Sequence, residues 1–508
     1  MPKQGELPEL AATVLQPGFV GTSAPDWVRR RLNEGLGGVA LFARNVESPA
    51  QVAALTAQLR AERPDVIVAI DEEAGDVTRF ESRHGSSRPG NLALGAIDDP
   101  ALTEAVARDL GTELANAGIT LDYAPDTDVN SNPDNPVIGV RAFGAEPQLV
   151  ARHSAAFVRG LQDAGVAACA KHFPGHGDTS VDSHHDVPLI DRDRAGLDAC
   201  ELLPFRAAIE AGVRAVMTGH LLVPAFDDSL PATLSPRILT GLLREELGFD
   251  GLIVTDGIEM EGVRRTYGLA GATVRALVAG ADAICVGGEH ADEQTATVLR
   301  DAIVQAVRDG ELPAERLAEA AERVRRLGAW TTRRQNRGPV RSAANGSAVG
   351  FDAARRAVRV TIADGATALP IDRPAHVVEF APPRNIAIGA ETPWGIGAPL
   401  DDLLPGTTSV RLTADDVEGL ADPVASVLAG ANGRALILVA RDVHRHPWLA
   451  GALARVLAAR PDAIVVEMGV PVTVLGGVHI ATYGATRANG LAAAEVIAGS
   501  PVPAPLAA

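Results

Sequence analysis

The stretch VIVAIDEE, residues 66–73, sets the pattern of this sequence, because it is a short, unbroken apolar run that ends in charged residues. Unbroken apolar runs, in contrast to alternating ones, are typical of strands that are buried on both faces of a parallel sheet. Similar runs occur at residues 12–19, 38–45, 119–129, 166–173, 213–222, 251–257 and 281–288. Together these runs predict eight buried strands in the first part of the chain.

Longer amphipathic stretches separate these runs. From Leu149 to Leu161, apolar residues recur at three- and four-residue spacing, which places them on one face of a helix. The stretches 273–279 and 292–308 behave in the same way. Eight strand–helix units over roughly 320 residues predict an α/β protein with a (β/α)8 TIM barrel. An open doubly wound sheet is the alternative, but no G-x-G-x-x-G motif follows an early strand.

The chain is long enough for a second domain. Residues 331–350 are polar and rich in Arg, Gly, Ser and Asn, which is typical of a linker. Strand-like runs then follow at 357–365, 376–381, 435–442 and 463–469, with a helical pattern at 446–460. We therefore predict a barrel domain at 1–330, a linker at 331–350, and a smaller α/β sandwich domain with parallel strands at 351–508.

The composition excludes several classes of protein. Of 508 residues, 46% are hydrophobic and 22% charged, which is ordinary for a globular protein and excludes bulk disorder. The net charge of −18, with no basic block, predicts no nucleic-acid partner and no membrane partner. Three cysteines cannot all pair, so a disulfide framework is not expected. The first residues lack the basic start and apolar run of a signal peptide, so we expect a cytoplasmic protein.

Polar residues follow most of the expected barrel strands. Chemistry in such barrels gathers where the strands end and the following loops begin. The polar residues at these ends are Asp71, Glu72, Glu73, Asp126, Asp128, Lys171, His172, His220 and Asp256. Because the same position is polar on many strands, these residues predict an active site and not a set of scattered surface charges.

The segment KHFPGHGDTSVDSHHDVP, residues 171–188, is the densest in chemistry-bearing side chains. Its Gly, Pro, Asp and Ser content is that of a loop. The loop can be read as solvated and without a role, as a zinc or manganese site, or as the carrier of a His–Asp acid/base pair. We favour the acid/base pair, in which a carboxylate orients an imidazole and raises its pKa.

Lysine is almost absent from this chain. The two lysines are Lys3 and Lys171, and all other Lys and Arg positions are arginine. A compact ammonium does not replace a planar guanidinium, so a lysine that persists within the fold indicates a specific role. The scarcity of lysine therefore makes Lys171 a candidate binding residue.

Several motifs, taken together, resemble glycoside hydrolase family 3, and specifically its NagZ-type β-N-acetylglucosaminidases. KHFPGHGDTSVDSH at 171–184 is similar to the family's signature loop. IDEEAGDVTRF at 70–80, DVNSNPDNPVIGVRAFG at 128–144 and GLIVTDGIEM at 251–260 resemble further family segments in the same order. The sequence departs from the usual pattern at EEAG (72–75) and at Gly257, and neither departure removes a titrating group that the mechanism needs. The C-terminal region resembles, more weakly, the sandwich domain of two-domain members.

The resemblance implies a role for each matching residue. Asp256 would be the nucleophile, His184 the general acid/base, and Asp182 the carboxylate partner of that histidine. His185 adjoins His184 and competes with it for the assignment. The residues implied to hold the sugar in the first subsite are Asp71, Arg79, Arg141, Lys171, His172 and His220. No metal and no cofactor are implied.

The implied activity is that of a retaining exo-enzyme. It would release terminal β-linked N-acetylglucosamine from muropeptides or chitin-type oligosaccharides through a covalent glycosyl-aspartate, and so act in the recycling of imported peptidoglycan fragments. A neutral histidine repels phosphate less than a carboxylate does, so inorganic phosphate is an alternative acceptor and phosphorylase an alternative activity. A family 3 β-glucosidase, a metal-dependent barrel hydrolase and a noncatalytic sugar-binding protein are the competing interpretations.

Overall fold

The computed structural model describes residues 4–179, 187–288, 290–335, 346–366, 369–383, 385, 387–389, 391–420 and 422–499. The chain divides into two compact units. Unit 1 comprises residues 1–73, 100–138 and 144–344, and unit 2 comprises residues 74–99, 139–143 and 345–508. Two segments from the N-terminal part of the chain thus group with the C-terminal residues. The domain limits 1–330, 331–350 and 351–508 stay a prediction.

Unit 1 contains a parallel (β/α)8 barrel, which confirms the predicted fold. Its strands are β1 (Leu15–Pro17), β2 (Gly38–Leu41), β3 (Ile67–Ile70), β4 (Leu121–Asp122), β5 (Ala167–Phe173), β6 (Ala215–Thr218), β7 (Leu252–Thr255) and β8 (Ile284–Val286). Strands β2 to β7 form one sheet in chain order, and β1 pairs in parallel with β8. A bridge between Val254 and Ala283 joins β7 to the segment before β8. Each of the eight apolar runs contains one of these strands.

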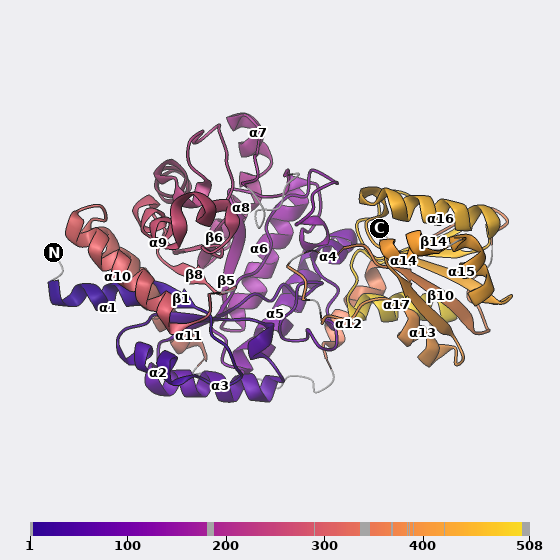
Figure 1. Ribbon diagram of the computed structural model, residues 1–508, viewed down its shortest axis with the longest axis horizontal. Helices are drawn as coiled ribbons and strands as arrows, with labels where there is room; N and C mark the ends of the chain where they lie inside the picture. Colours follow the sequence, from indigo (N-terminus) through magenta and orange to yellow (C-terminus); the bar gives the residue numbers. More distant parts are fainter. Residues whose placement is uncertain are drawn as a thin grey trace. The chain divides into compact units, whose positions relative to one another are not determined.

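Helices follow the strands and surround them (Figure 1). They are α1 (Leu7–Thr13), α2 (Asp26–Asn33), α3 (Pro49–Glu62), α5 (Pro100–Asn116), α6 (Pro147–Asp163), α7 (Arg194–Ala199), α8 (Leu202–Glu210), α9 (Glu261–Ala279), α10 (Glu293–Asp309) and α11 (Ala314–Gln335), with a π-helical segment at Arg237–Glu246. Helix α6 buries Val150, Phe157 and Leu161, as its periodicity predicts. Among the described residues, no helix combines the length and apolar character needed to cross a bilayer.

The barrel interior is filled by side chains from strands β2 to β8. Small residues such as Ala69 and Ala167 lie beside larger ones such as Tyr123 and Met217 in one buried cluster. Val324 and Leu327 of α11 belong to the same cluster, so this helix packs against the barrel core. The interior is therefore a packed core, which leaves the strand ends as the place for a site.

Unit 2 is a three-layer α/β sandwich. Its sheet has the order β11 (Thr408–Leu412), β10 (Ala375–Phe380), β12 (Ala435–Ala440), β13 (Ile464–Glu467), β14 (Val478–Ala481) and β9 (Arg359–Ile362). Helices α12 (Ala348–Ala357), α13 (Gly397–Leu403) and α17 (Arg487–Ala498) contribute to the core on one face, and α14 (Ala414–Gly419), α15 (Pro423–Ala431) and α16 (Pro447–Ala459) to the core on the other (Figure 1). The sequence predicts parallel strands, which is wrong for β9, because β9 pairs antiparallel with β14.

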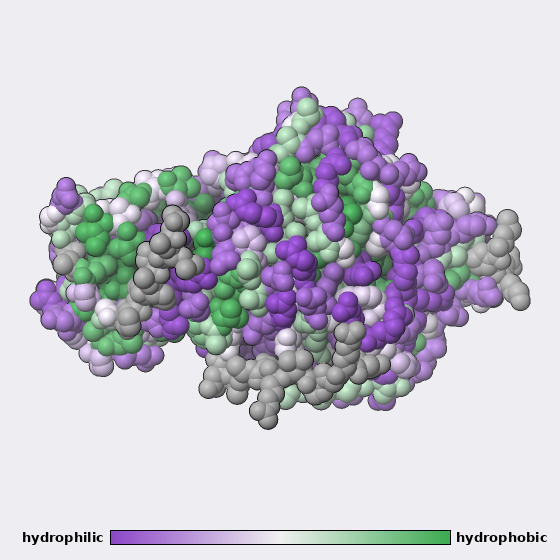
Figure 2. Space-filling view, turned by 180° about the vertical axis from the view of Figure 1, so that it is seen from behind, coloured by the Kyte–Doolittle hydropathy of each residue, from purple (hydrophilic) through white to green (hydrophobic). Residues whose placement is uncertain are grey.

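The two edge strands of this sheet, β9 and β11, are exposed. Figure 2 shows several hydrophobic residues on the surface of unit 2. Among the residues of this unit that the structure describes, the exposed large apolar side chains are Val360, Ile362, Val410, Val472 and Val474. Val360 and Ile362 lie on β9 and Val410 on β11, so three of the five belong to the edge strands.

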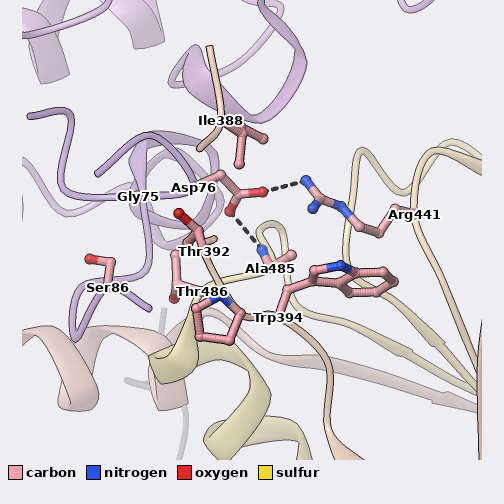
Figure 3. Close-up of a pocket in the computed structure, with 10 residues that line it drawn as sticks. Gly75, Asp76, Ser86, Ile388, Thr392, Trp394, Arg441, Ala485 and Thr486 are labelled. Carbon is pink, nitrogen blue, oxygen red and sulfur yellow. Dashed lines mark hydrogen bonds and ion pairs between the residues drawn. The ribbon is translucent and has the colours of Figure 1, made fainter. Parts of the chain in front are cut away.

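Residues 74–99 group with unit 2 through a buried ion pair. The Asp76 carboxylate pairs with Arg441 and also accepts a 2.8 Å hydrogen bond from the Ala485 backbone N–H (Figure 3). The guanidinium of Arg441 in turn lies 5.4 Å from the ring centroid of Trp394. The cavity beside these groups is only about 10 Å³, which is the space of a water molecule. This part of unit 2 is therefore a packing junction and does not have room for a sugar.

Candidate active site

Lys171 lies at the carboxyl end of β5 between two carboxylates. Its Nζ is 2.6 Å from Glu73 Oε1 and also pairs with Asp71. Both acids follow β3, so two strands that lie on either side of β4 supply the ammonium and its partners. The Lys171 side chain is 2% exposed and that of Asp71 is 21% exposed. Asp71 is therefore the member of the group that is accessible to a ligand.

Asp128 collects three N–H donors just after β4. Its Oδ2 is 2.7 Å from His172 Nδ1, and its Oδ1 accepts from the backbone N–H groups of His172 at 3.2 Å and His176 at 2.7 Å. Burial raises the pKa of this carboxyl, but the charges and hydrogen bonds of His172 and His176 outweigh burial and hold the pKa below its usual range. Asp128 therefore orients the His172 ring as an anion.

Asp256 directly follows β7, at the same end of the barrel. Its Oδ1 accepts a 2.7 Å hydrogen bond from the Gly257 backbone N–H. The carbonyl of Gly257 is 3.0 Å from His220 Nε2, and His220 Nδ1 is 2.8 Å from Thr233 Oγ1. Both ring nitrogens of His220 are thus engaged by the protein, and the ring supports the backbone beside Asp256.

The loop after β5 is held against the loop after β4. Asn135 Nδ2 donates to the His176 carbonyl at 2.9 Å, and Asn132 Nδ2 donates to the Thr179 carbonyl at 3.3 Å. A Cβ atom on Gly177 would lie 1.7 Å from the Val129 carbonyl oxygen, so no larger residue fits there without movement of the chain. The glycine at the end of the GHG motif, residues 175–177, therefore allows the backbones of the loops after β4 and β5 to come close together.

His184 and Asp182, the predicted acid/base pair, lie outside the described residues, as does His185. The chain on each side of this segment is anchored. Asp178 pairs with Arg192 at 2.6 Å, and a parallel bridge joins Leu189 to Leu222 after β6. The assignment of the proton donor stays a prediction.

Arg79 and Arg141 belong to unit 2. Arg79 Nη1 donates to the Ala387 carbonyl at 2.9 Å. Arg141 is buried, and its carbonyl accepts a 2.7 Å hydrogen bond from Asn91 Nδ2. The remaining predicted subsite residues, Asp71, Lys171, His172 and His220, lie in unit 1 at the carboxyl ends of its strands.

The chain matches the model of the glycosyl hydrolase family 3 N-terminal domain over residues 22–327. It belongs to glycoside hydrolase family 3. A solved family 3 β-N-acetylglucosaminidase from Paenibacillus sp. str. FPU-7 is 34% identical, with a TM-score of 0.84 and 97% of each chain covered.

Two curated relatives extend this similarity. The β-hexosaminidase of Thiobacillus denitrificans is 40% identical over 284 residues, which are 54% of this chain and 78% of the relative. The β-hexosaminidase A of Pseudoalteromonas piscicida is 40% identical over 268 residues, which are 49% of this chain and 45% of the relative. Recognition of the family from the sequence motifs is thus confirmed, and the chain is a glycoside hydrolase.

One group of side chains in this family 3 enzyme has the composition of a metal site. Ligand atoms of Asp126, Asp128 and His172 lie within 4.8 Å of one another and are buried. The nitrogen of His172 that faces this group, Nδ1, is already hydrogen-bonded to Asp128. A metal would have to displace that proton, so the donor set fits an acid–imidazole pair better than a metal site.

Glu73 and Asp128 belong to the site, although the sequence motifs do not assign them to it. Both are acidic residues at strand ends, but the loop motifs direct attention to Asp182 and His184. The signal that could have found them is the strand order of the barrel. The carboxyl ends of consecutive parallel strands lie at one end of the barrel, so Glu73 after β3 and Asp128 after β4 come near the end of β5.

Proposed function

We propose that this chain is a retaining exo-β-N-acetylglucosaminidase in which Asp256 forms the covalent glycosyl-enzyme. The observation that carries the proposal is the position of Asp256 directly after β7, on the barrel end that also holds Lys171 and His172. Its Oδ1 accepts a hydrogen bond from the Gly257 N–H, which orients the carboxylate. The matched Paenibacillus structure is titled a β-N-acetylglucosaminidase, which supports this activity.

The reaction needs an ionised nucleophile and a proton donor for the leaving oxygen. Asp256 would attack the anomeric carbon while His184, oriented by Asp182, gives its proton to the departing sugar hydroxyl. In the second step the same imidazole would accept a proton from water as it attacks the glycosyl-aspartate. A histidine suits both steps near neutral pH, because its ordinary pKa lies close to that range.

The sugar would be held by the groups around β3 and β5. Asp71, the more exposed partner of Lys171, is suited to accept hydrogen bonds from sugar hydroxyl groups, and Lys171 to donate them. His172 would offer Nε2, because its Nδ1 is engaged by Asp128. Arg79 and Arg141 are proposed as further sugar ligands from the family motifs alone.

The substrate class follows from the relatives, which are named β-hexosaminidases. We propose terminal β-linked N-acetylglucosamine in muropeptide or chitin-type oligosaccharides. The described chain has three buried cysteines without disulfide partners, which fits a reducing compartment and supports action in the cytoplasm on imported fragments. Activity in the cytoplasmic but not the periplasmic fraction of source cells would test that location.

One experiment tests the activity and the nucleophile together. Aryl β-glycosides with and without the N-acetyl group are assayed, and the preferred sugar is then supplied as a slow 2- or 5-fluoro analogue. Mass spectrometry should locate the adduct on the peptide that contains Asp256, and Asp256→Ala should lose nearly all turnover. Asp309→Ala, an exposed acid at the end of α10, is the matched control and should retain full activity. An adduct on Asp71 or Asp128 would contradict the assignment.

The acceptor is a separate question. We propose water, with inorganic phosphate as the competing acceptor that a histidine base tolerates. Product analysis in millimolar phosphate separates the two, since hydrolysis yields free sugar and phosphorolysis yields sugar 1-phosphate.

A further inference from the structure

A second cleft lies at the opposite end of the barrel from the catalytic residues. It has a volume of about 460 Å³ and is bordered by Arg214, which precedes β6, and by Asp250, which precedes β7. Helix α11 supplies the remaining wall through Arg323, Arg326, Leu327, Trp330 and Arg333. A cleft of this size falls within the range of small-molecule sites. All of these residues belong to unit 1.

Trp330 is the aromatic centre of this cleft. The guanidinium of Arg214 lies 5.0 Å from the ring centroid of Trp330, and that of Arg334 lies 5.5 Å from it. Guanidinium groups at these distances are attracted by the ring face and are held in place. Arginine side chains fixed in this way lose less conformational entropy when a ligand binds.

The cleft carries an excess of positive charge. Among the described residues, Arg214, Arg333 and Arg334 have no carboxylate within ion-pair distance, whereas Asp250 pairs with Arg326 at 3.0 Å and with Arg323 at 3.5 Å. Burial, followed by the like charges of Arg334 and Arg326, lowers the pKa of Arg214. The whole chain has a net charge of −18, so this positive surplus is local.

We propose that this cleft binds a small organic phosphate through Arg214 and Arg333, with the phosphate group beside Trp330. Guanidinium forks bind phosphate oxygens in a bidentate manner, and a dianion would relieve the repulsion among the unpaired arginines. The volume exceeds what an inorganic ion needs, so the phosphate carries an organic group such as a sugar or a nucleoside. The proposal does not rest on the glycosidase activity, because the two sites lie at opposite barrel ends.

The test is a binding titration of the full chain by calorimetry and tryptophan fluorescence. The probes are glucose 6-phosphate, AMP and inorganic pyrophosphate, with glucose and adenosine as uncharged counterparts. We expect saturable binding of at least one organic phosphate and none of the uncharged compounds, with affinity falling as salt rises. The stronger of the two organic probes identifies the sugar or the nucleoside as the organic group.

Variants assign the site. Arg333→Ala and Arg214→Ala should each weaken binding by about tenfold, the equivalent of one charge-assisted hydrogen bond. Arg455→Ala, which removes an equally exposed arginine from α16 in unit 2, is the matched control and should bind as the parent does. Turnover of an aryl glycoside without phosphate should be unchanged in all three variants, which verifies that they are folded.

Any of the following results would overturn the proposal. They are no saturable binding at millimolar concentrations of either organic phosphate, equal weakening by Arg455→Ala, or binding that survives the combined Arg214→Ala and Arg333→Ala changes. Pyrophosphate binding without organic phosphate binding would also contradict it, because the cleft would then hold only an inorganic anion.

Discussion

Lys171 and Glu73 form an ion pair inside the barrel mouth, with Nζ and Oε1 2.6 Å apart and both side chains at most 3% exposed. Asp71 completes the group from the more exposed side. The ammonium thus has one carboxylate toward the protein interior and one toward the opening. Glu73 fixes the position of Lys171, which leaves Asp71 and Lys171 to meet the sugar together.

Removal of the ammonium should therefore harm both stability and activity. Lys171→Met leaves Asp71 and Glu73 as uncompensated neighbouring charges, and we expect the free energy of unfolding to fall by about 3–5 kcal/mol. Adding Glu73→Gln to this variant should recover much of the stability, because one of the two repelling charges is removed, without recovery of activity. Chemical unfolding and aryl-glycoside kinetics measure the two quantities. Equal stability of the single and double variants would show that the pair is not coupled.

The Asp128–His172 pair predicts that chelators leave the enzyme active. Asp128 already accepts three N–H bonds, and His172 Nδ1 lies 2.7 Å from its Oδ2, so this carboxylate–imidazole pair is satisfied without an ion. Prolonged treatment with EDTA should not change turnover, and elemental analysis should find no stoichiometric zinc or manganese. Loss of activity that zinc restores would favour the metal-dependent hydrolase instead.

Asp128→Asn should damage the same region by a different route. The carboxylate of Asp128 accepts from three N–H donors with its two oxygens. The amide of Asp128→Asn has only one acceptor oxygen for these donors, and its NH₂ group would face one of them. We expect a loss of about 1–3 kcal/mol in stability together with weaker substrate binding. Chemical unfolding and the KM for the aryl glycoside are the readouts. Unchanged stability and an unchanged KM would contradict a role for Asp128 in holding His172.

The contact at Gly177 predicts strong sensitivity to a single methyl group. Gly177→Ala places a Cβ about where the Val129 carbonyl oxygen lies, so the two loops must separate and turnover should fall sharply. Gly271→Ala is the matched control, since a Cβ there meets only the Tyr267 Cβ at 4.0 Å within helix α9. That change should be neutral or stabilising by up to about 1 kcal/mol. Thermal unfolding and kinetics of the two variants compare them, and equal turnover would show that the loop contact is unimportant.

The sequence predicted the elements of this fold better than the grouping of its segments. Unbroken apolar runs located all eight barrel strands, since burial on both faces leaves a clear pattern. In unit 2, β11 and β14 were missed and β9 was taken as parallel. β11 and β9 are exposed edge strands, whereas β14 is buried but only four residues long. The grouping of residues 74–99 with unit 2 rests on long-range contacts such as the Asp76–Arg441 pair, which spans 365 positions and has no local signature.

The same reasoning explains the site. Asp71, Lys171, His172, His220 and Asp256 could be named because each adjoins a strand that the sequence shows clearly. Glu73 was named among the polar residues at strand ends but was given no role, because only its three-dimensional neighbour, Lys171, reveals that role. His220 was expected among the sugar ligands, yet its ring nitrogens meet Thr233 and Gly257, a relation that depends on how the loop after β6 turns back.

Unit 2 carries a titrating group that predicts how stability depends on pH. Burial, and then the charge of Asp442, raises the pKa of Glu467 from 4.5 to about 7. Because the folded state binds this proton more tightly than the unfolded state, its contribution is present in full below about pH 4.5 and is lost as pH rises to 7. The Glu467→Gln variant has no titrating group at this position. Across that window its free energy of unfolding should therefore fall less than that of the parent, by roughly 2–3 kcal/mol. Unfolding measured from pH 4.5 to 7.5 compares the two proteins, and parallel curves would contradict the raised pKa.

The final prediction concerns His184, whose role the family motif implies. A general acid matters in proportion to how strongly the leaving group needs a proton. Nitrophenolate leaves nearly unaided, whereas a sugar hydroxyl does not. His184→Ala should therefore slow cleavage of natural disaccharides more than of nitrophenyl glycosides, by a further factor on the order of 10² to 10⁴. With activated substrates, the slowed second step should produce a burst of nitrophenol as the glycosyl-enzyme accumulates.

Neighbouring residues provide the controls for this assignment. Asp182→Ala should show the same dependence on the leaving group in milder form, because it orients the imidazole and does not itself transfer the proton. His176 is anchored through Thr179 at 2.8 Å, so His176→Ala should lower both substrate types about equally through the loop. His185→Ala should also act equally on both. If His185→Ala alone shows the leaving-group dependence, the proton comes from the second histidine of the pair, and the catalytic loop must present its side chains one residue later than the motif implies.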